Sequence, residues 1–114
     1  MSFFNSEIVR AEMTEISEIQ EEIYGSIFKF PYMDKEDKIR HIDLLETLLK
    51  KQQVLYTRLS LSDDPEAKEM KKKIMDSALV MGLNPSTDMN IIFNNMSKIL
   101  EAMKSNIDKR EPGV

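Results

Sequence analysis

Apolar residues recur at helical spacing along almost the whole chain, and this pattern constrains the fold more than any other feature. Over residues 6 to 29 they return every three or four positions, so at 100° per residue they fall within about 60° of one line along a helix. The members of this first stripe are Val9, Met13, Ile16, Ile19, Ile23, Ile27 and Phe30. No stretch of useful length alternates between apolar and polar residues, as a half-buried strand would require. The pattern predicts a long amphipathic helix.

Two further segments carry stripes of the same kind. In residues 35 to 60 the stripe includes the polar Gln52 and is otherwise formed by Ile42, Leu45, Leu48, Leu49, Tyr56 and Leu59. In residues 85 to 108 it is formed by Met89, Ile92, Phe93, Met96, Ile99, Leu100, Met103 and Ile107. A shorter segment, residues 65 to 81, ends in an apolar turn. These segments predict two more long helices and one shorter helix.

Capping residues, glycines and prolines mark where the helices begin and end. Three segments open on a capping residue, twice followed by proline at the first helical position; these residues are Asp34, Asp64-Pro65 and Asn84-Pro85. Gly82 suits the end of the shorter helix. Pro31 ends the first helix, and Gly25 makes its last turn irregular. We therefore expect one helical domain over residues 1 to 109, followed by a frayed tail at 110 to 114.

The lengths of the helices indicate how they pack. A helix of about 24 to 26 residues is about 36 to 39 Å long, close to the diameter of a compact chain of this size. The predicted fold is therefore an all-α antiparallel bundle of three long helices and one shorter helix. Such a monomer cannot bury apolar stripes that run the whole length of each helix, so we expect a homodimer.

The composition excludes most catalytic chemistry. The 114 residues include no cysteine and one histidine, which rules out disulfides, thiolate nucleophiles and cysteine-based zinc sites. No glycine-rich loop is present to hold a phosphate, so we expect no cofactor. The longest apolar run, Ala78 to Met81, is far shorter than the ~18 residues of a transmembrane helix. No leader segment opens the chain, and we expect a cytoplasmic protein.

His41 and the acidic clusters are the remaining candidates for catalysis or metal binding. His41 could act as a general base oriented by Asp37, four residues earlier. A structural histidine bonded to Asp37 is the more common arrangement, because no activated serine or cysteine accompanies it. The stretch from Asp63 lacks the glycine and the final glutamate of a calcium loop. We expect no catalytic residue and no metal ligand, and a His41→Ala variant that keeps its fold and its partner.

Charge is distributed unevenly, although the net charge is only −4. Residues 1 to 28 contain six acidic residues and one basic residue, whereas residues 49 to 75 contain seven basic and four acidic residues. A cluster that could hold phosphate groups is formed by Lys68, Lys71, Lys72 and Lys73. It lacks interleaved aromatic residues or arginines for base contacts, and Glu69 is spaced to pair with two of its lysines. Nucleic-acid contact is therefore possible but disfavoured.

More residues are candidates for contacts with a protein partner. Acidic residues that could steer a partner towards the first helix are Glu15, Glu18 and Glu22. Apolar residues outside the stripes, which could hold the partner, are Ile39, Val54 and Ile91. Six of the nine methionines lie between residues 70 and 103. At helical spacing methionines are more often core residues, but methionine-rich faces also form adaptable binding surfaces.

Three short motifs stand out beside the stripes. They are Phe3-Phe4-Asn5-Ser6-Glu7-Ile8-Val9, Leu61-Ser62-Asp63-Asp64 and Met81-Gly82-Leu83-Asn84-Pro85. With these motifs the chain resembles, over residues 1 to 107, a small helical family of unknown function from cyanobacteria and cyanophages. The family has no established activity, so the resemblance implies a cytoplasmic helical protein and transfers no catalytic residue. The chain has 12 lysines and 12 isoleucines against four arginines and four alanines. This bias indicates an AT-rich genome, as in a phage or a small streamlined bacterium. Together with the resemblance, it fits a phage-encoded copy of a host protein.

The sequence therefore predicts a non-enzymatic interaction or regulatory protein that binds a host or cognate protein through its helix faces. The alternative is a regulator associated with nucleic acid or with RNA polymerase through the lysine cluster at residues 68 to 73.

Overall fold

The computed structural model describes residues 3–80 and 89–109, which are almost entirely helical. In chain order the elements are the 3-10 helix η1 (Phe3–Asn5), α1 (Glu7–Ser26), the 3-10 helix η2 (Ile27–Tyr32), α2 (Lys35–Leu61), α3 (Pro65–Val80) and α4 (Met89–Lys109). Three long helices and one shorter helix, with no strand among the described residues, confirm the all-α fold that the stripes predicted.

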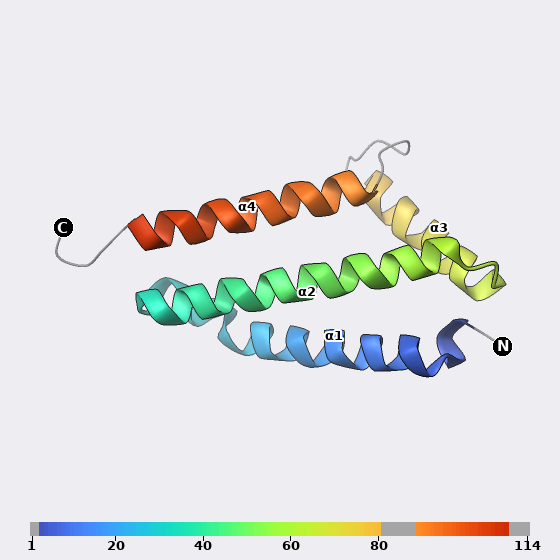
Figure 1. Ribbon diagram of the computed structural model, residues 1–114, viewed down its shortest axis with the longest axis horizontal. Helices are drawn as coiled ribbons and strands as arrows, with labels where there is room; N and C mark the ends of the chain where they lie inside the picture. The colour runs from blue at the N-terminus through green and yellow to red at the C-terminus, as the bar shows by residue number, and fades with distance from the viewer. Residues whose placement is uncertain (1–2, 81–88, 110–114) are drawn as a thin grey trace.

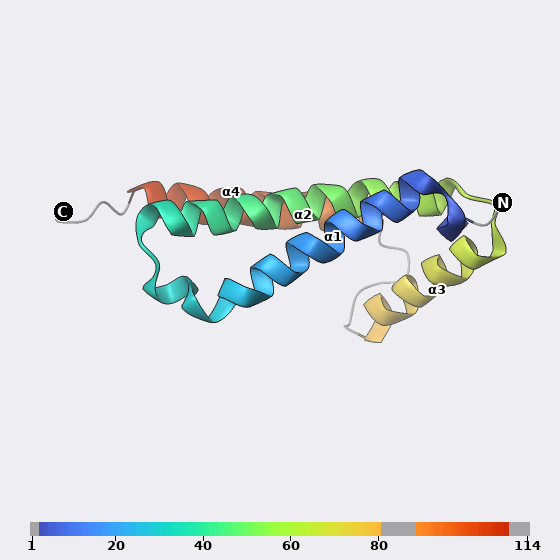
Figure 2. The ribbon, with the colours of Figure 1, turned by 90° about the horizontal axis from the view of Figure 1, so that it is seen from below.

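Helix α2 is the centre of the molecule (Figure 1). Helices α1 and α4 pack on two sides of α2, antiparallel to it, and make hardly any contact with each other. Helix α3 turns back from the C-terminal end of α2 and packs against α2 and η1. In the perpendicular view, α1 and α3 project to the same side of the layer formed by α2 and α4 (Figure 2). The helices thus form an open bundle of 57 × 32 × 19 Å.

The local signals for the start of α2 and α3 are confirmed. The carboxylate of Asp34 accepts a hydrogen bond from the backbone N–H of Asp37 at 2.8 Å, which caps α2. The carboxylate of Asp64 accepts one from the N–H of Glu66 at 3.0 Å and another from the N–H of Phe3. The cap of α3 therefore also ties η1 to the start of that helix.

The first helix ends earlier than the sequence predicted. α1 stops at Ser26, and the chain continues as the 3-10 helix η2, which contains Pro31. Gly25 lowers the helix propensity of the last α-helical turn, and Pro31 has no N–H with which to continue an α-helical hydrogen-bond pattern. Residues 81–88 and 110–114, which include the predicted signals at Gly82 and Asn84-Pro85 and the predicted tail, lie outside the described residues.

The buried core is small and lies where α2 meets its neighbours. Its apolar members are Val9, Ile16, Ile23, Ile42, Leu49, Leu59, Ala67 and Phe93. The radius of gyration is 16.8 Å, against about 13 Å for a compact chain of this length. Packing between the helices therefore covers only part of each apolar stripe.

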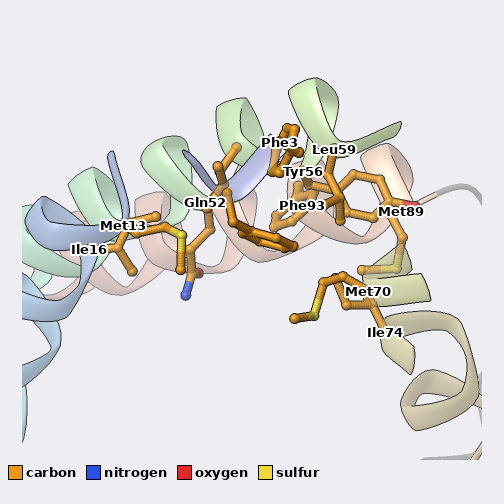
Figure 3. A pocket seen from close by; sticks show the side chains of 12 residues that line it. Phe3, Met13, Ile16, Gln52, Tyr56, Leu59, Met70, Ile74, Met89 and Phe93 are labelled. Carbon is orange, nitrogen blue, oxygen red and sulfur yellow. The ribbon is translucent and has the colours of Figure 1, made fainter. Parts of the chain in front are cut away.

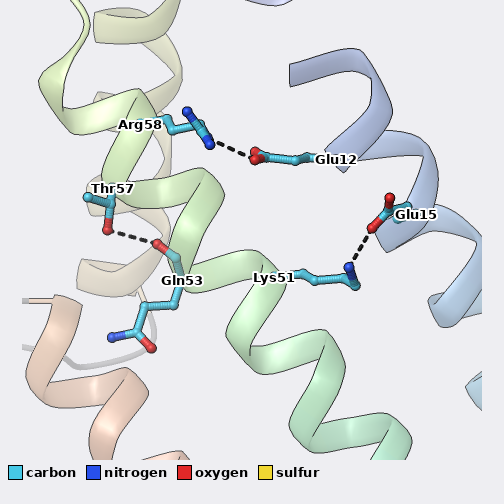
Figure 4. A network of polar contacts seen from close by, with 6 residues as sticks. All are labelled: Glu12, Glu15, Lys51, Gln53, Thr57 and Arg58. Carbon is cyan, nitrogen blue, oxygen red and sulfur yellow. Dashed lines mark hydrogen bonds and ion pairs between the residues drawn. The ribbon is translucent and has the colours of Figure 1, made fainter. Parts of the chain in front are cut away.

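Ion pairs fix α1 and α4 to α2. Arg58 of α2 donates a hydrogen bond to Glu12 of α1 at 2.8 Å, and Lys51 pairs with Glu15 (Figure 4). On the other side of α2, Lys104 of α4 bonds to Asp43 and Glu46. The hydrogen bonds to Asp43 and Glu46 raise the pKa of Lys104 above its ordinary value. No helix in the described part of the chain combines the length and the apolar character needed to cross a bilayer.

Candidate docking groove

An apolar groove runs along α2, between α1 and α4. Its first hollow has a volume of about 340 Å³, and all four α-helices and η1 contribute to its walls (Figure 3). Among the residues that line it are Phe3, Met13, Tyr56, Met70, Ile74 and Phe93. The second hollow, of about 250 Å³, lies between α2 and α4 and is lined by Leu45, Leu48, Leu49, Met96, Ile99 and Leu100. Gln52 lines both hollows, which therefore adjoin each other along α2 and are together termed the groove.

The groove exists because α2 presents its stripe between its two neighbours. At 100° per residue, the α2 side chains that pair with α1, Lys51 and Arg58, lie about 100° to 120° from Gln52. Glu46, which pairs with α4, lies about 120° from Gln52 in the other direction. The middle of the α2 stripe therefore lies between the two flanks and forms the floor of the groove.

The walls of the groove are half-covered methionines and isoleucines. Met13 of α1, Met70 of α3 and Met96 of α4 each line a hollow and each remain exposed. Ile99, at 59 % exposure, is the most exposed apolar residue of the groove. The methionines of the groove are therefore partly covered, as core residues are, and partly exposed, as residues of a binding surface are.

Apart from Tyr56, which carries a hydroxyl group, Gln52 is the one polar side chain that lines these two hollows. Figure 3 shows it reaching out from α2 beside Met13, and its amide makes no hydrogen bond within the described part of the chain. The sequence signalled this position, because Gln52 interrupts an otherwise apolar stripe.

A comparison with family models gives one match. The model of a domain of unknown function, DUF1825, matches residues 1–107. The chain belongs to this family. The matched residues are those over which the sequence resembles a helical family without established activity. Neither the search of curated proteins nor the search of solved structures gave a match.

The contact residues that the sequence predicted for this DUF1825 chain do not line the groove. Glu15 is engaged by Lys51 in the α1–α2 interface, whereas Glu18 and Glu22 are exposed on α1. Val54 and Ile91 are exposed, and Ile39 is half-buried near the C-terminal end of α4. Of the predicted protein contacts, Glu15 is therefore the one already used inside the chain.

The predicted lysine cluster lies on α3 and is exposed throughout. At 100° per residue, Lys68, Lys71 and Lys72 fall within an arc of about 100°. Lys73 lies on another side of the helix, where its ammonium group is 3.9 Å from Glu69. The cluster therefore offers three lysines on one face rather than four.

His41 lies on α2 with its ring buried against η2. Its Nδ1 atom is 3.2 Å from the hydroxyl oxygen of Ser26, and its ring centre is 5.2 Å from that of Phe30. The expected bond to Asp37 is wrong, because that carboxylate pairs instead with Arg40 at 3.2 Å. No local pattern signalled the Ser26 contact, which joins residues 15 positions apart. No group of three or more potential metal ligands is found among residues 3–80 and 89–109.

Four exposed apolar residues lie within nine positions of the chain, at the end of α1 and in η2, and we term this segment the aromatic end. It consists of Tyr24, Ile27, Phe28 and Tyr32. Ile27 was expected to face the core as a member of the first stripe, but it is 45 % exposed because the α-helix ends before it. Tyr24, Phe28 and Tyr32 were not predicted as contact residues, although Phe28 falls outside the first stripe and so was a detectable signal. Glu18 and Glu22 lie on the neighbouring turns of α1 and form no ion pair within the described residues.

Proposed function

We propose that this chain is a non-enzymatic interaction protein that binds a host or cognate protein at the aromatic end. The exposure of two large aromatic side chains supports this most directly, since Phe28 is 89 % exposed and Tyr32 is 90 % exposed. Exposed apolar patches mark interaction sites, and aromatic residues contribute much of the binding energy at protein interfaces. The partner would bury these two rings.

The charges beside the aromatic end favour a basic partner. Glu18 and Glu22 lie within three turns of Phe28 and are available to a partner, whereas Glu15 is held by Lys51. Acidic side chains at the rim of an interface accelerate association with a basic surface. We therefore propose a protein that presents an apolar pocket surrounded by lysine or arginine.

Site-specific photo-crosslinking tests this proposal. A photoreactive phenylalanine analogue at position 28 should crosslink one protein in cells that contain the native partner. The double variant Glu18→Lys, Glu22→Lys should lose this crosslink, whereas the control Glu101→Lys, an exposed charge reversal on α4, should keep it. A protein partner that remains bound to the double variant would show that the binding surface lies elsewhere.

A regulator associated with nucleic acid or RNA polymerase is the second candidate function. It is favoured by the common exposed face of Lys68, Lys71 and Lys72 on α3. A complex that depends on phosphate contacts weakens steeply with salt. If Lys71→Glu with Lys72→Glu abolishes a salt-sensitive complex that Glu18→Lys with Glu22→Lys leaves intact, this second function replaces the first.

We also propose that the protein acts in the cytoplasm of a cyanobacterium, encoded either by the cell or by a phage. The motif resemblance and the excess of lysine over arginine support this origin. Fractionation of such cells with an antibody against the chain should recover it in the cytoplasmic fraction, and recovery in another compartment would contradict the proposal.

A further inference from the structure

The apolar wall that α4 contributes to the groove repeats like the seam of a coiled coil. Alternating steps of three and four residues connect Met89, Ile92, Met96, Ile99 and Met103. This seam is turned about 80° away from Phe93, which faces α2. Met96 is 47 % exposed and Ile99 is 59 % exposed, so the side of α4 best suited to contact another helix is the side that α2 does not cover.

Exposed apolar side chains on three helices indicate where cover is missing. Met103, on the seam of α4, is 37 % exposed, and Met13 of α1 and Met70 of α3 are 43 % and 38 % exposed. Met13 and Met70 line the first hollow of the groove. A helix laid in the groove would bury such side chains together.

The charges on α4 favour a second copy as the occupant. A two-fold interface brings each surface against itself, so a surface with charges of one sign repels its own copy. Residues 89–107 contain only three charged residues, Lys98, Glu101 and Lys104. The positions that flank the seam on its outer side are Asn95, Ala102 and Asn106, all uncharged. In such an interface, the glutamates of α1 or the lysines of α3 would face like charges of the second copy and repel them.

The position of α3 favours an antiparallel over a parallel arrangement of the two α4 helices. α3 closes one end of the groove with Met70 and Ile74, near the start of α4, and leaves the other end open. A parallel pair would bring both α3 helices to the same end, whereas an antiparallel pair separates them. Met96 and Ile99 lie near the middle of α4 and line the open hollow, which places the two-fold axis beside them.

We propose that the groove of one chain receives helix α4 of a second copy, antiparallel to its own α4, and that the second copy receives the first in the same way. The homodimer completes the apolar core that the open bundle leaves half-covered. This inference goes beyond the proposed function, because the groove and the aromatic end do not share a residue.

Cysteine crosslinking tests the proposal, because the chain contains no natural cysteine. Under mild oxidation Ile99→Cys should give a disulfide-linked dimer, since position 99 lies beside the two-fold axis. Met89→Cys should not, because antiparallel copies hold this position about 25 Å apart at 1.5 Å per residue. Crosslinking at both positions would indicate a parallel pair and overturn the proposed orientation.

Sedimentation velocity of two matched variants tests the surface itself. Ile99→Ser replaces a groove residue, whereas Val54→Ser replaces a residue of similar exposure on the opposite side of α2. Serine and isoleucine have similar helix propensities, so both helices should persist. Ile99→Ser should weaken the dimer at least tenfold and Val54→Ser should leave it unchanged. A wild-type monomer, or equal effects of the two variants, would overturn the proposal. Neither result bears on binding at the aromatic end.

Discussion

Ile42 provides a sharp test of the described packing, because it is the most completely buried large side chain. Its exposed fraction is 0 %, whereas Ile39, one turn earlier on α2, is half-buried. Replacing a buried isoleucine by alanine costs about 2 to 5 kcal/mol, depending on how well the surroundings close the cavity. The layer is thin and its groove is open, so the site can relax, and we expect about 3 kcal/mol for Ile42→Ala. Ile39→Ala should cost about 1 kcal/mol or less, since less apolar surface is lost from the buried state.

The stability lost in Ile42→Ala is large compared with the total free energy of unfolding. A chain of this length is stable by roughly 6 to 17 kcal/mol, so 3 kcal/mol should lower the melting temperature by about 10 to 20 °C. Urea denaturation followed by circular dichroism measures both variants, at one protein concentration because association contributes to apparent stability. Equal costs for Ile42→Ala and Ile39→Ala would refute the described register of α2, which buries one residue and leaves the other at the edge.

Three further predictions concern polar groups. Because the pKa of Lys104 is raised in the folded state, its contribution is complete below the ordinary lysine value of about 10.4 and is lost as the pH rises through the raised value. Lys104→Met should therefore unfold at lower urea than wild type at pH 8, and the difference should shrink at higher pH; a constant difference contradicts this. His41→Ala should cost about 1 to 3 kcal/mol in urea denaturation, because it leaves a void beside Phe30 and removes one of the hydrogen-bond partners of Ser26. Partner binding at Phe28 should survive, and an unchanged stability would show that His41 is not packed there. Gln52→Leu should tighten the homodimer about tenfold, since an amide in an apolar seam lowers stability; weaker association in sedimentation equilibrium would show that the amide gains a partner across the interface.

The elements could be predicted because their signals are local. The stripes set the helical period, and the carboxylates of Asp34 and Asp64 cap α2 and α3 as their positions indicated. The end of α1 was placed too late, at residue 29, because the α-helical and 3-10 helical patterns of residues 27 to 32 look alike in sequence. The structure places the change at Ser26, where the backbone (φ −122°, ψ −4°) leaves α-helical geometry.

The arrangement of the helices could not be predicted in the same way. A stripe shows which residues avoid water, but not which neighbour covers them. α2 is covered on two flanks by α1 and α4, and the residues between those flanks, such as Leu45 and Gln52, line a groove instead of a core. The contact between Ser26 and His41 likewise depends on how η2 folds back, which no local pattern encodes.

The candidate surfaces were predictable only in part. The exposure of Glu18, Glu22, Val54 and Ile91 follows from their positions outside the stripes. Glu15 has the same position on its helix, but Lys51 of α2 lies within reach and pairs with it. Such pairs depend on how far one helix is shifted along the other. The sequence of either helix alone does not specify that shift.

Small-angle X-ray scattering on the wild-type protein tests the proposed homodimer, because it gives mass and dimensions together. We expect a particle of about twice 13.3 kDa at micromolar concentration, with α4 covered by a second copy. A mass of 13.3 kDa with a radius of gyration near 16.8 Å at every concentration would contradict it. In that case the open groove would be the surface of a monomer.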